Sequence, residues 1–296
     1  MAYEQTIRSA TECEGIGLHS GVPVHLKILP APAGTGIVFR RIDLDGFEIE
    51  AVGRNVAKVS YATSLMKKGV LISTTEHLLA AFMGMGVDNA IVELDNLEIP
   101  ILDGSAQPFV DMIVRAGLRR QRRRRTCLRI RRALELREGG KFIGVYPAKG
   151  YSVAYTIDFP HPLIGRESFE VQLSNGQFLR EIASARTFGF LEQEQAMRNM
   201  GLIRGASLEN AVCFTPTGPL NPEGLRADDE CCRHKALDLI GDLALVGRPL
   251  LGHVIAERAG HAMHAALVKT IMSDPSIYEI LTFDQLASRV TQALVN

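Results

Sequence analysis

The first part of the chain alternates apolar and polar residues in short runs that are separated by turn residues. Segments 6–21 (TIRSATECEGIGLHSG) and 22–41 (VPVHLKILPAPAGTGIVFRR) show this pattern. A period of two residues places apolar side chains on one face of a strand, so both segments predict β-strands. Pro30, Pro32 and the glycines within 34–36 interrupt the second segment, because proline cannot continue a sheet ladder and glycine favours turns.

A helical period follows in segment 73–89 (STTEHLLAAFMGMGVDN). Apolar residues recur at positions 78, 79, 82 and 83, and Gly84 and Gly86 favour a helix end. The next segment, 90–105 (AIVELDNLEIPILDGS), predicts a buried strand followed by a turn.

The sharpest change in composition is segment 119–126 (RRQRRRRT). A block of like charges is typical of a solvated linker, and no aromatic residue interleaves it as in many nucleic-acid contacts. We therefore expect an N-terminal domain at 1–120, an arginine-rich linker at 121–126 and a C-terminal domain at 127–296. Attraction of the arginines to anionic lipid headgroups is a minor alternative.

The second half begins with strand-like segments at 127–147 and 151–165. Helix-like stretches follow at Leu191–Met200, Asp229–Val246 and His261–Ser273. Strands and helices mix without a strict β-α-β rhythm or a glycine-rich nucleotide turn, so an α+β fold is favoured over a doubly wound sheet.

Composition narrows the classes of protein to consider. The chain has 296 residues, of which 46% are hydrophobic and 22% charged, and its formal net charge is zero. No global charge therefore favours nucleic acid or a membrane surface as a partner. No secretory signal pattern or long apolar span is present, so we expect a cytoplasmic protein. An odd number of cysteines, 5, without regular spacing indicates free thiols.

Segment 228–243 (DDECCRHKALDLIGDL) is the first candidate for chemistry. On a helix with about 100° per residue, His234 and Asp238 lie on one face and could hold one metal ion. The same spacing also forms an ordinary surface hydrogen bond, which is the commoner structure. Cys231 shares the face, but no second Cys pair completes a structural zinc site, so Cys231 and Cys232 are expected to pack as small apolar residues.

A hydrolytic zinc site needs a third ligand from elsewhere in the chain. His77 is a candidate, with Glu76 beside it as a possible general base. Ser73 and Glu76 also match a capping box, in which the glutamate only bonds back to the helix start. The remaining histidine candidates are His19, His261 and His264. Spacing alone does not choose among these residues.

Nine motifs, taken together, resolve the choice. In order they are GIGLHSG, STTEHLLAA, GVDNAIVEL, EIPILDGSA, IDFPHP, SARTFGF, LNPEGLR, RHKALDLIGDL and GHAM, between about Thr6 and Val268. By these motifs the chain resembles the UDP-3-O-acyl-N-acetylglucosamine deacetylases of lipid A biosynthesis. The resemblance implies two α+β domains, each a small sheet packed on helices, placed face to face with the active site between them. It also implies an insert in each domain, the second a β-α-β insert near 190–214.

The same resemblance assigns roles to residues. It implies zinc as the cofactor, with Fe²⁺ as an alternative in the cell, and His77, His234 and Asp238 as its ligands. Glu76 matches the general base that activates water, and His261 matches the cation that stabilises the oxyanion and protonates the leaving amine. Further matches are Asp242, which orients His261, and Thr187, which donates its hydroxyl to the same oxygen.

Substrate contacts are also implied by the resemblance. Lys235 would bind the hexosamine or its phosphate and Phe188 would border the substrate. Lys141 and Phe159 would contact the uridine diphosphate. The residues expected to line the acyl passage are Met197, Leu202, Ala206 and Val212.

Three features depart from the family pattern. Gln193 and Glu194 make the insert polar, His264 stands where asparagine is usual, and Cys231–Cys232 replace apolar residues.

The sequence thus predicts a zinc-dependent amidohydrolase that releases acetate from UDP-3-O-acyl-N-acetylglucosamine, an early committed step of lipid A biosynthesis. A monomer is expected, with the acylated UDP-sugar as its partner and no nucleic acid. The rivals are a zinc deacylase for another acylated sugar and a non-catalytic binder of anionic surfaces through Arg119–Arg125.

Overall fold

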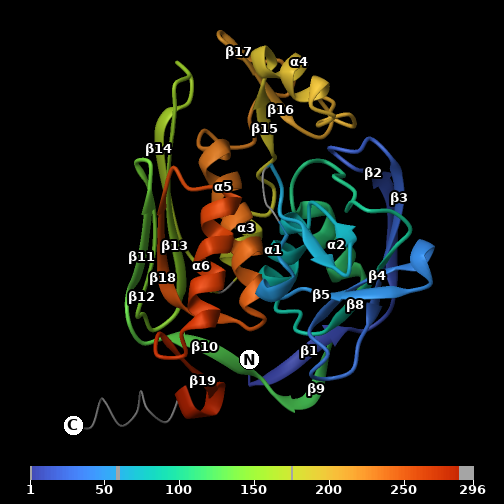
Figure 1. The fold of residues 1–296 in the computed structure, drawn as a ribbon, viewed down its shortest axis with the longest axis vertical. Helices are drawn as coiled ribbons and strands as arrows, with labels where there is room; N and C mark the ends of the chain where they lie inside the picture. Colours follow the sequence, from blue (N-terminus) through green and yellow to red (C-terminus); the bar gives the residue numbers. More distant parts are fainter. Residues whose placement is uncertain (1, 58–60, 175, 287–296) are drawn as a thin grey trace.

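Two β-sheets form the outer layers of the molecule, and helices fill the space between them (Figure 1). The computed structural model describes residues 2–57, 61–174 and 176–286. One sheet has the strand order β2 (Thr11–Ile16), β3 (Pro23–Pro30), β8 (Ala90–Leu94), β4 (Ile37–Arg41) and β5 (Phe47–Glu50). The short hairpin of β6 (Leu65–Lys67) and β7 (Val70–Ile72) leads from this sheet toward the helices. The α+β class expected from the sequence is confirmed.

The second sheet belongs to the later half of the chain. Its main path is β11 (Leu134–Glu138), β12 (Lys141–Tyr146), β18 (Leu250–Glu257), β10 (Thr126–Ile130) and β19 (Tyr278–Thr282). From β18 the sheet also continues to β13 (Tyr151–Phe159) and β14 (Gly165–Gln172). Alternate residues of β13 are buried, from Tyr151 to Ile157, so this sheet turns one apolar face toward the helices.

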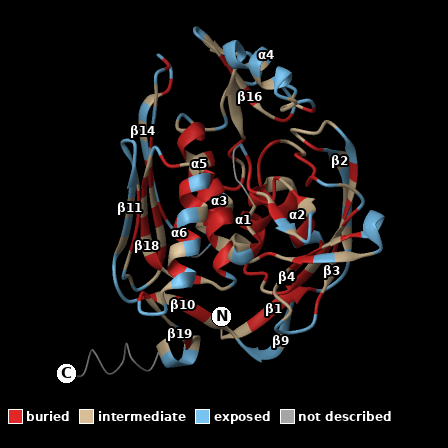
Figure 2. Ribbon diagram, viewed as in Figure 1, coloured by how far each residue is buried: buried red, intermediate tan, exposed pale blue. Residues whose placement is uncertain are grey.

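The helical layer contains α1 (Glu76–Met85) and α2 (Gln107–Ala116) from the first half of the chain. From the second half come α3 (Gln177–Glu181), α5 (Glu230–Leu243) and α6 (His261–Ser273). α1 and α5 are buried along most of their length (Figure 2). Helices that are buried on nearly all sides lie in the middle of a core, and these two helices pack against each other. The predicted helices at 191–200, 229–246 and 261–273 are confirmed.

A small unit projects beyond one end of the helical layer (Figure 1). It contains β15 (Phe188–Phe190), α4 (Leu191–Asn199) and β16 (Val212–Thr215), with β17 (Gly218–Pro219) beside β16. β15 and β16 pair in parallel, so the three elements form the β-α-β arrangement expected near 190–214. The residues of α4 are half-buried or exposed, unlike those of α1 and α5 (Figure 2).

The arginine run is a strand, so the linker expected at 121–126 is wrong as a description of local structure. β9 (Leu118–Arg124) pairs antiparallel with β1 (Tyr3–Ile7), and Thr126 already begins β10. Gln121 points inward, where its side chain bonds Asn89 and the Ala31 carbonyl. The division into domains at this point stays a prediction.

Neighbouring groups offset the charges of this strand. The Arg120 and Arg124 guanidinium groups lie 3.8 and 4.5 Å from the centre of the Tyr3 ring. Arg125 pairs with Asp88 at 2.7 Å. Cation–π stacking and ion pairs of this kind let a block of like charges adopt an ordered strand.

In the part of the chain that the structure describes, no helix combines the length and the apolarity needed to cross a bilayer.

Candidate active site

Helix α5 presents four polar side chains, one per turn, to the interior. Glu230, His234, Asp238 and Asp242 are spaced four residues apart and each is only 1% exposed. Burial of this degree is unusual for charged residues unless they are paired or hold an ion. The buried polar residues therefore indicate a functional site around α5 and the start of α1.

His77 from α1 completes a group with two of these residues. Its Nε2 lies 3.5 Å from Asp238 Oδ1, and His234 Nε2 lies 3.3 Å from the same oxygen. The three ligand atoms lie within 4.8 Å of one another. Asp238 Oδ1 is buried and has no hydrogen-bond partner among the described residues. Two imidazole nitrogens converging on an orphaned carboxylate oxygen fit a divalent cation.

The ring of His234 is held in the orientation that a metal ligand requires. Its Nδ1–H donates to the Ala185 carbonyl at 3.0 Å, which leaves Nε2 free to face Asp238. Burial lowers the pKa of His234 to about 3, so the ring is neutral and Nε2 carries a lone pair. Metal-binding histidines are commonly oriented through their second nitrogen in this way.

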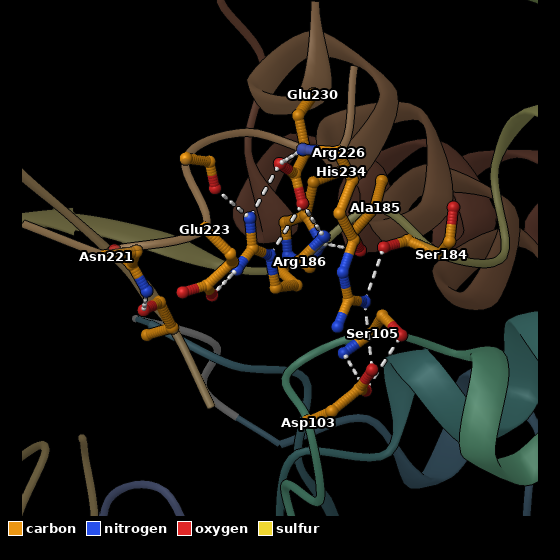
Figure 3. Close-up of polar contacts among 12 residues, drawn as sticks. Asp103, Ser105, Ser184, Ala185, Arg186, Asn221, Glu223, Arg226, Glu230 and His234 are labelled. Atoms are coloured by element: carbon orange, nitrogen blue, oxygen red, sulfur yellow. Dashed lines mark hydrogen bonds and ion pairs between the residues drawn. The ribbon is translucent and has the colours of Figure 1, made fainter. Parts of the chain in front are cut away.

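A buried ion pair fixes the carbonyl that orients His234 (Figure 3). The backbone N–H and the guanidinium of Arg186 both donate to the carboxylate of Glu230, at 2.9 Å. Arg186 is 2% and Glu230 1% exposed. The pair ties the loop that carries Ala185 to the first turn of α5. Arg226, also drawn in Figure 3, bonds the Ser184 carbonyl and Asp103, which links this loop to the first half of the chain.

A second cluster of histidines on Asp242 is not a metal site of the same kind. His261 Nδ1 and His264 Nδ1 each lie 2.8 Å from Asp242 Oδ2. At this distance each nitrogen carries a proton that it donates to the carboxylate, so neither offers a lone pair there. Asp242 therefore acts as an acceptor that orients two imidazole rings.

Glu76 does not cap its helix. It is the first residue of α1, and the helix start has no side-chain cap among the described residues. The Glu76 Oε2 instead accepts a hydrogen bond from the Thr63 backbone N–H at 3.0 Å, and Ser73 bonds Ser64. The capping-box alternative is therefore wrong, and the buried carboxylate is directed toward His261, whose Nε2 lies 3.9 Å from Oε1.

The titration of Glu76 and His261 follows from their surroundings. Burial raises the pKa of Glu76, although His261 and His77 oppose this shift. Burial alone would lower the pKa of His261, but the carboxylates of Asp242, Asp238 and Glu76 together outweigh it and raise the pKa to about 9. A buried carboxyl group and an imidazolium thus lie beside Asp238, with His261 Nε2 at 3.9 Å from Glu76 Oε1 and 3.8 Å from Asp238 Oδ2.

Thr63 connects Glu76 with His261, although no local pattern in the sequence predicted a role for it. Its hydroxyl donates to Asp242 Oδ1 at 2.5 Å and lies 3.2 Å from His261 Nδ1. Its backbone N–H holds Glu76. Because Thr63 and Asp242 are 179 residues apart, only the folded chain shows this relationship.

A cavity of about 390 Å³ reaches Lys235 of α5 and extends into the β-α-β unit. Lys235 lies at its inner end, where Nζ donates to Asp238 Oδ2 at 2.7 Å and faces the Phe188 ring. Thr187 also lines this cavity. Its outer wall contains Met197, Ala206 and Val212, among the residues expected to line an acyl passage.

The remaining residues that the sequence predicted for substrate contacts differ in their positions relative to this cavity. Leu202 is not among the lining residues, because the chain turns there and directs Ile203 into the cavity. Lys141 is exposed at the turn between β11 and β12. Phe159 packs its ring against Phe188 at 5.4 Å between centroids. Glu194 lines the cavity.

His19 also faces the cavity, and its Nε2 is buried without a partner among the described residues. The sequence offered His19 only as one of several candidates. The cysteine prediction is confirmed, since Cys231 and Cys232 are free and buried in the core.

Comparisons with known proteins identify the family of this chain. Residues 4–273 match the family model for UDP-3-O-acyl N-acetylglycosamine deacetylase. A UDP-3-O-acyl-N-acetylglucosamine deacetylase of Solibacter usitatus is 64% identical over 296 residues, covering 100% of both chains. The enzymes of the same name from Myxococcus xanthus and Xylella fastidiosa are 47% and 41% identical, covering 94% and 97% of this chain and 89% and 96% of their own. The chain belongs to the UDP-3-O-acyl N-acetylglycosamine deacetylase family.

Proposed function

We propose that this protein hydrolyses the N-acetyl group of UDP-3-O-acyl-N-acetylglucosamine and releases acetate, an early committed step of lipid A biosynthesis. The observation that carries the proposal is the convergence of His77 and His234 on the orphaned Asp238 oxygen, with Glu76 and His261 beside it. An acid–base pair next to a metal-binding group is what amide hydrolysis requires.

We propose zinc as the resident metal. Two imidazoles and one carboxylate are a ligand set that zinc accepts while keeping a position open for catalysis, and Fe²⁺ is the alternative that the cell could supply. The bound ion would supply the Lewis acidity that polarises the amide carbonyl and makes water a nucleophile near neutral pH.

The protein's own side chains then divide the proton transfers. Glu76 accepts the proton of the attacking water. His261, held as a cation by Asp242, donates a hydrogen bond to the carbonyl oxygen as negative charge develops there. Thr187 donates a hydrogen bond from its hydroxyl to the same carbonyl oxygen. His261 then gives its proton to the leaving amine.

The cavity supports the assignment of the substrate. Its lining is largely apolar beyond Lys235, which suits an acyl chain that runs from Lys235 past Phe188 into the β-α-β unit. Lys235 would contact the sugar or its phosphate. Lys141 and Phe159 would contact the uridine diphosphate. The protein would act in the cytoplasm as a monomer.

Two measurements test this function together. Metal content by elemental analysis should show about one zinc per chain, since one site of this kind is built. Acetate release should depend on the 3-O-acyl chain of the UDP-sugar. Equal rates with and without the acyl chain would favour a deacylase for another sugar. Absence of acetate release from a fully metal-loaded protein would reject the assignment.

A further inference from the structure

A second cavity, of about 280 Å³, lies apart from the substrate cavity and shares none of its lining residues. Its walls come from the second half of α1, the segment that follows α5, the β1–β9 ribbon and the region around β4 and β5. Small-ligand sites have volumes of about 300–1,000 Å³. The cavity therefore approaches the size of small-ligand sites.

One part of its lining is apolar. Leu79, Phe82 and Met83 of α1 contribute to it, together with Val87 and Pro249. Apolar side chains around an open cavity can bind the hydrocarbon part of a ligand, because contact removes both surfaces from water.

The rest of the lining includes charged residues, and their charges do not cancel. Arg125 pairs with Asp88 at 2.7 Å, and Arg123 pairs with Glu4 at 3.3 Å. Arg54 lies 3.7 Å from Glu50, which also holds Lys67. These pairs engage each of the acidic side chains that line the cavity.

Arg248 is the exception. Its side chain is half-buried, and its Nη1 donates to the Thr126 hydroxyl at 2.5 Å. Among the described residues it has no carboxylate partner. A guanidinium has five N–H donors, so donors remain for an oxyanion, which it can bind through two parallel hydrogen bonds.

We propose that this cavity is a second binding site, and that it takes a small amphiphilic anion. A phosphate or carboxylate group would bind Arg248, and a short hydrocarbon part would lie against Leu79, Phe82 and Met83. This site also gives a role to part of the arginine run, because Arg123 and Arg125 complete the charged wall.

The site bridges the two helices that carry the catalytic group. α1 begins with Glu76 and His77 and contacts the cavity in its second half, while Ala244 and Arg248 follow the end of α5. A ligand would thus contact both halves of the chain at once. Because it would bind the folded state, it should also raise the thermal midpoint of unfolding.

Calorimetric titration of the metal-loaded protein tests the site. Two probes, hexyl phosphate and hexanoate, combine an anionic group with a hydrocarbon chain. Two half-probes carry one feature each: inorganic phosphate has only the anionic group and 1-hexanol only the hydrocarbon chain. We expect one of the amphiphilic anions to bind, and the two half-probes to bind much more weakly. Comparing the first two probes shows which oxyanion the site prefers.

Variants locate the binding. Arg248→Gln should weaken it about ten- to a hundredfold, the loss of a charge-assisted hydrogen bond, and Arg248→Lys should retain part of it. Arg137→Gln, an exposed arginine of β11, is the matched control and should bind like the unchanged protein. Lys235→Gln shows by the same titration whether the probe binds in the substrate cavity instead.

Two results would overturn the proposal. One is the absence of millimolar binding of either amphiphilic anion. The other is binding that Lys235→Gln abolishes and Arg248→Gln leaves intact, which would place the probe in the acyl passage. Circular dichroism and the thermal midpoint without probe check that each variant is folded.

Discussion

Gly241 of α5 lies directly against the backbone of Glu76 at the start of α1. A Cβ atom at position 241 would lie 2.0 Å from the Glu76 carbonyl oxygen and 3.0 Å from its Cα. Only a residue without a side chain lets the two helices approach this closely. The contact therefore sets the distance between the base on α1 and the residues of α5.

Replacing this glycine should damage catalysis more than it damages the helix. Alanine is a better helix former than glycine by about 1 kcal/mol, so Gly241→Ala favours α5 itself. The added Cβ must displace the first turn of α1, and a shift of about 1 Å at a reacting group can cost on the order of 100-fold in rate. Acetate release and metal content measure the effect. Gly218→Ala, where a Cβ meets nothing within 4 Å, is the control and should remain active.

Glu76 and His234 should separate catalysis from metal binding. Glu76→Gln keeps the shape of the side chain but removes the base, so turnover should fall about 10²- to 10⁴-fold with the metal retained. His234→Ala removes a ligand, so the metal itself should be lost. Elemental analysis and acetate release distinguish the two. Full turnover by Glu76→Gln would mean that this carboxylate only stabilises the fold.

His264 should act by holding Asp242. His264→Leu removes one of the N–H donors to the carboxylate, so we expect stability to fall by about 1–3 kcal/mol and kcat to fall with little change in KM. His264→Asn can still offer an N–H and should restore much of the rate. Equal losses in both variants, or a loss of stability with unchanged kcat, would show that His264 serves packing alone.

Thr63 should be coupled to His264, because both donate to Asp242. Thr63→Val keeps the shape and the backbone N–H that holds Glu76 but removes the hydroxyl, which should cost about tenfold in kcat/KM. Thr63→Ser should lose little. In the double variant with His264→Leu, the free-energy changes should not add, since the two residues share one partner. Additive losses would indicate that they act separately.

The pH profile should be bell-shaped. Activity requires Glu76 as a carboxylate, and burial raises the pKa of Glu76, so the acid limb should lie above the ordinary value of 4.5. Activity also requires protonated His261. Burial lowers the pKa of this ring, but Asp242, with Asp238 and Glu76, outweighs burial, so activity should fall as the pH rises through about 9.

Asp242→Asn tests whether the alkaline limb of the pH profile reports the titration of His261. Loss of the negative charge lowers the pKa of His261, so the limb should move to lower pH, with metal content measured at each pH as the control. An unmoved limb would assign it to another group.

The spacing within one helix was sufficient to predict part of the site. His234 and Asp238 lie four residues apart, and because a helix turns every 3.6 residues, their shared face did not depend on the rest of the chain. The helices at 191–200, 229–246 and 261–273 were predictable for the same reason. Local periodicity also predicted the mixture of strands and helices.

Other features depended on contacts between distant segments. The capping box at Ser73–Glu76 was plausible locally, but the backbone of Thr63 takes the carboxylate instead. The arginine run looked like a linker because its partners, Tyr3, Glu4 and Asp88, are far away in the sequence.

Sequence patterns therefore predict which faces and residue types a segment presents, because a regular backbone repeats its own geometry. The place where two segments meet depends on packing. The approach of Gly241 to Glu76, the sharing of Asp242 by two histidines, and the unpaired carboxylate oxygen of Asp238 arise only when α1, α5 and α6 are packed together. Burial then sets the pKa values that the proposed chemistry uses.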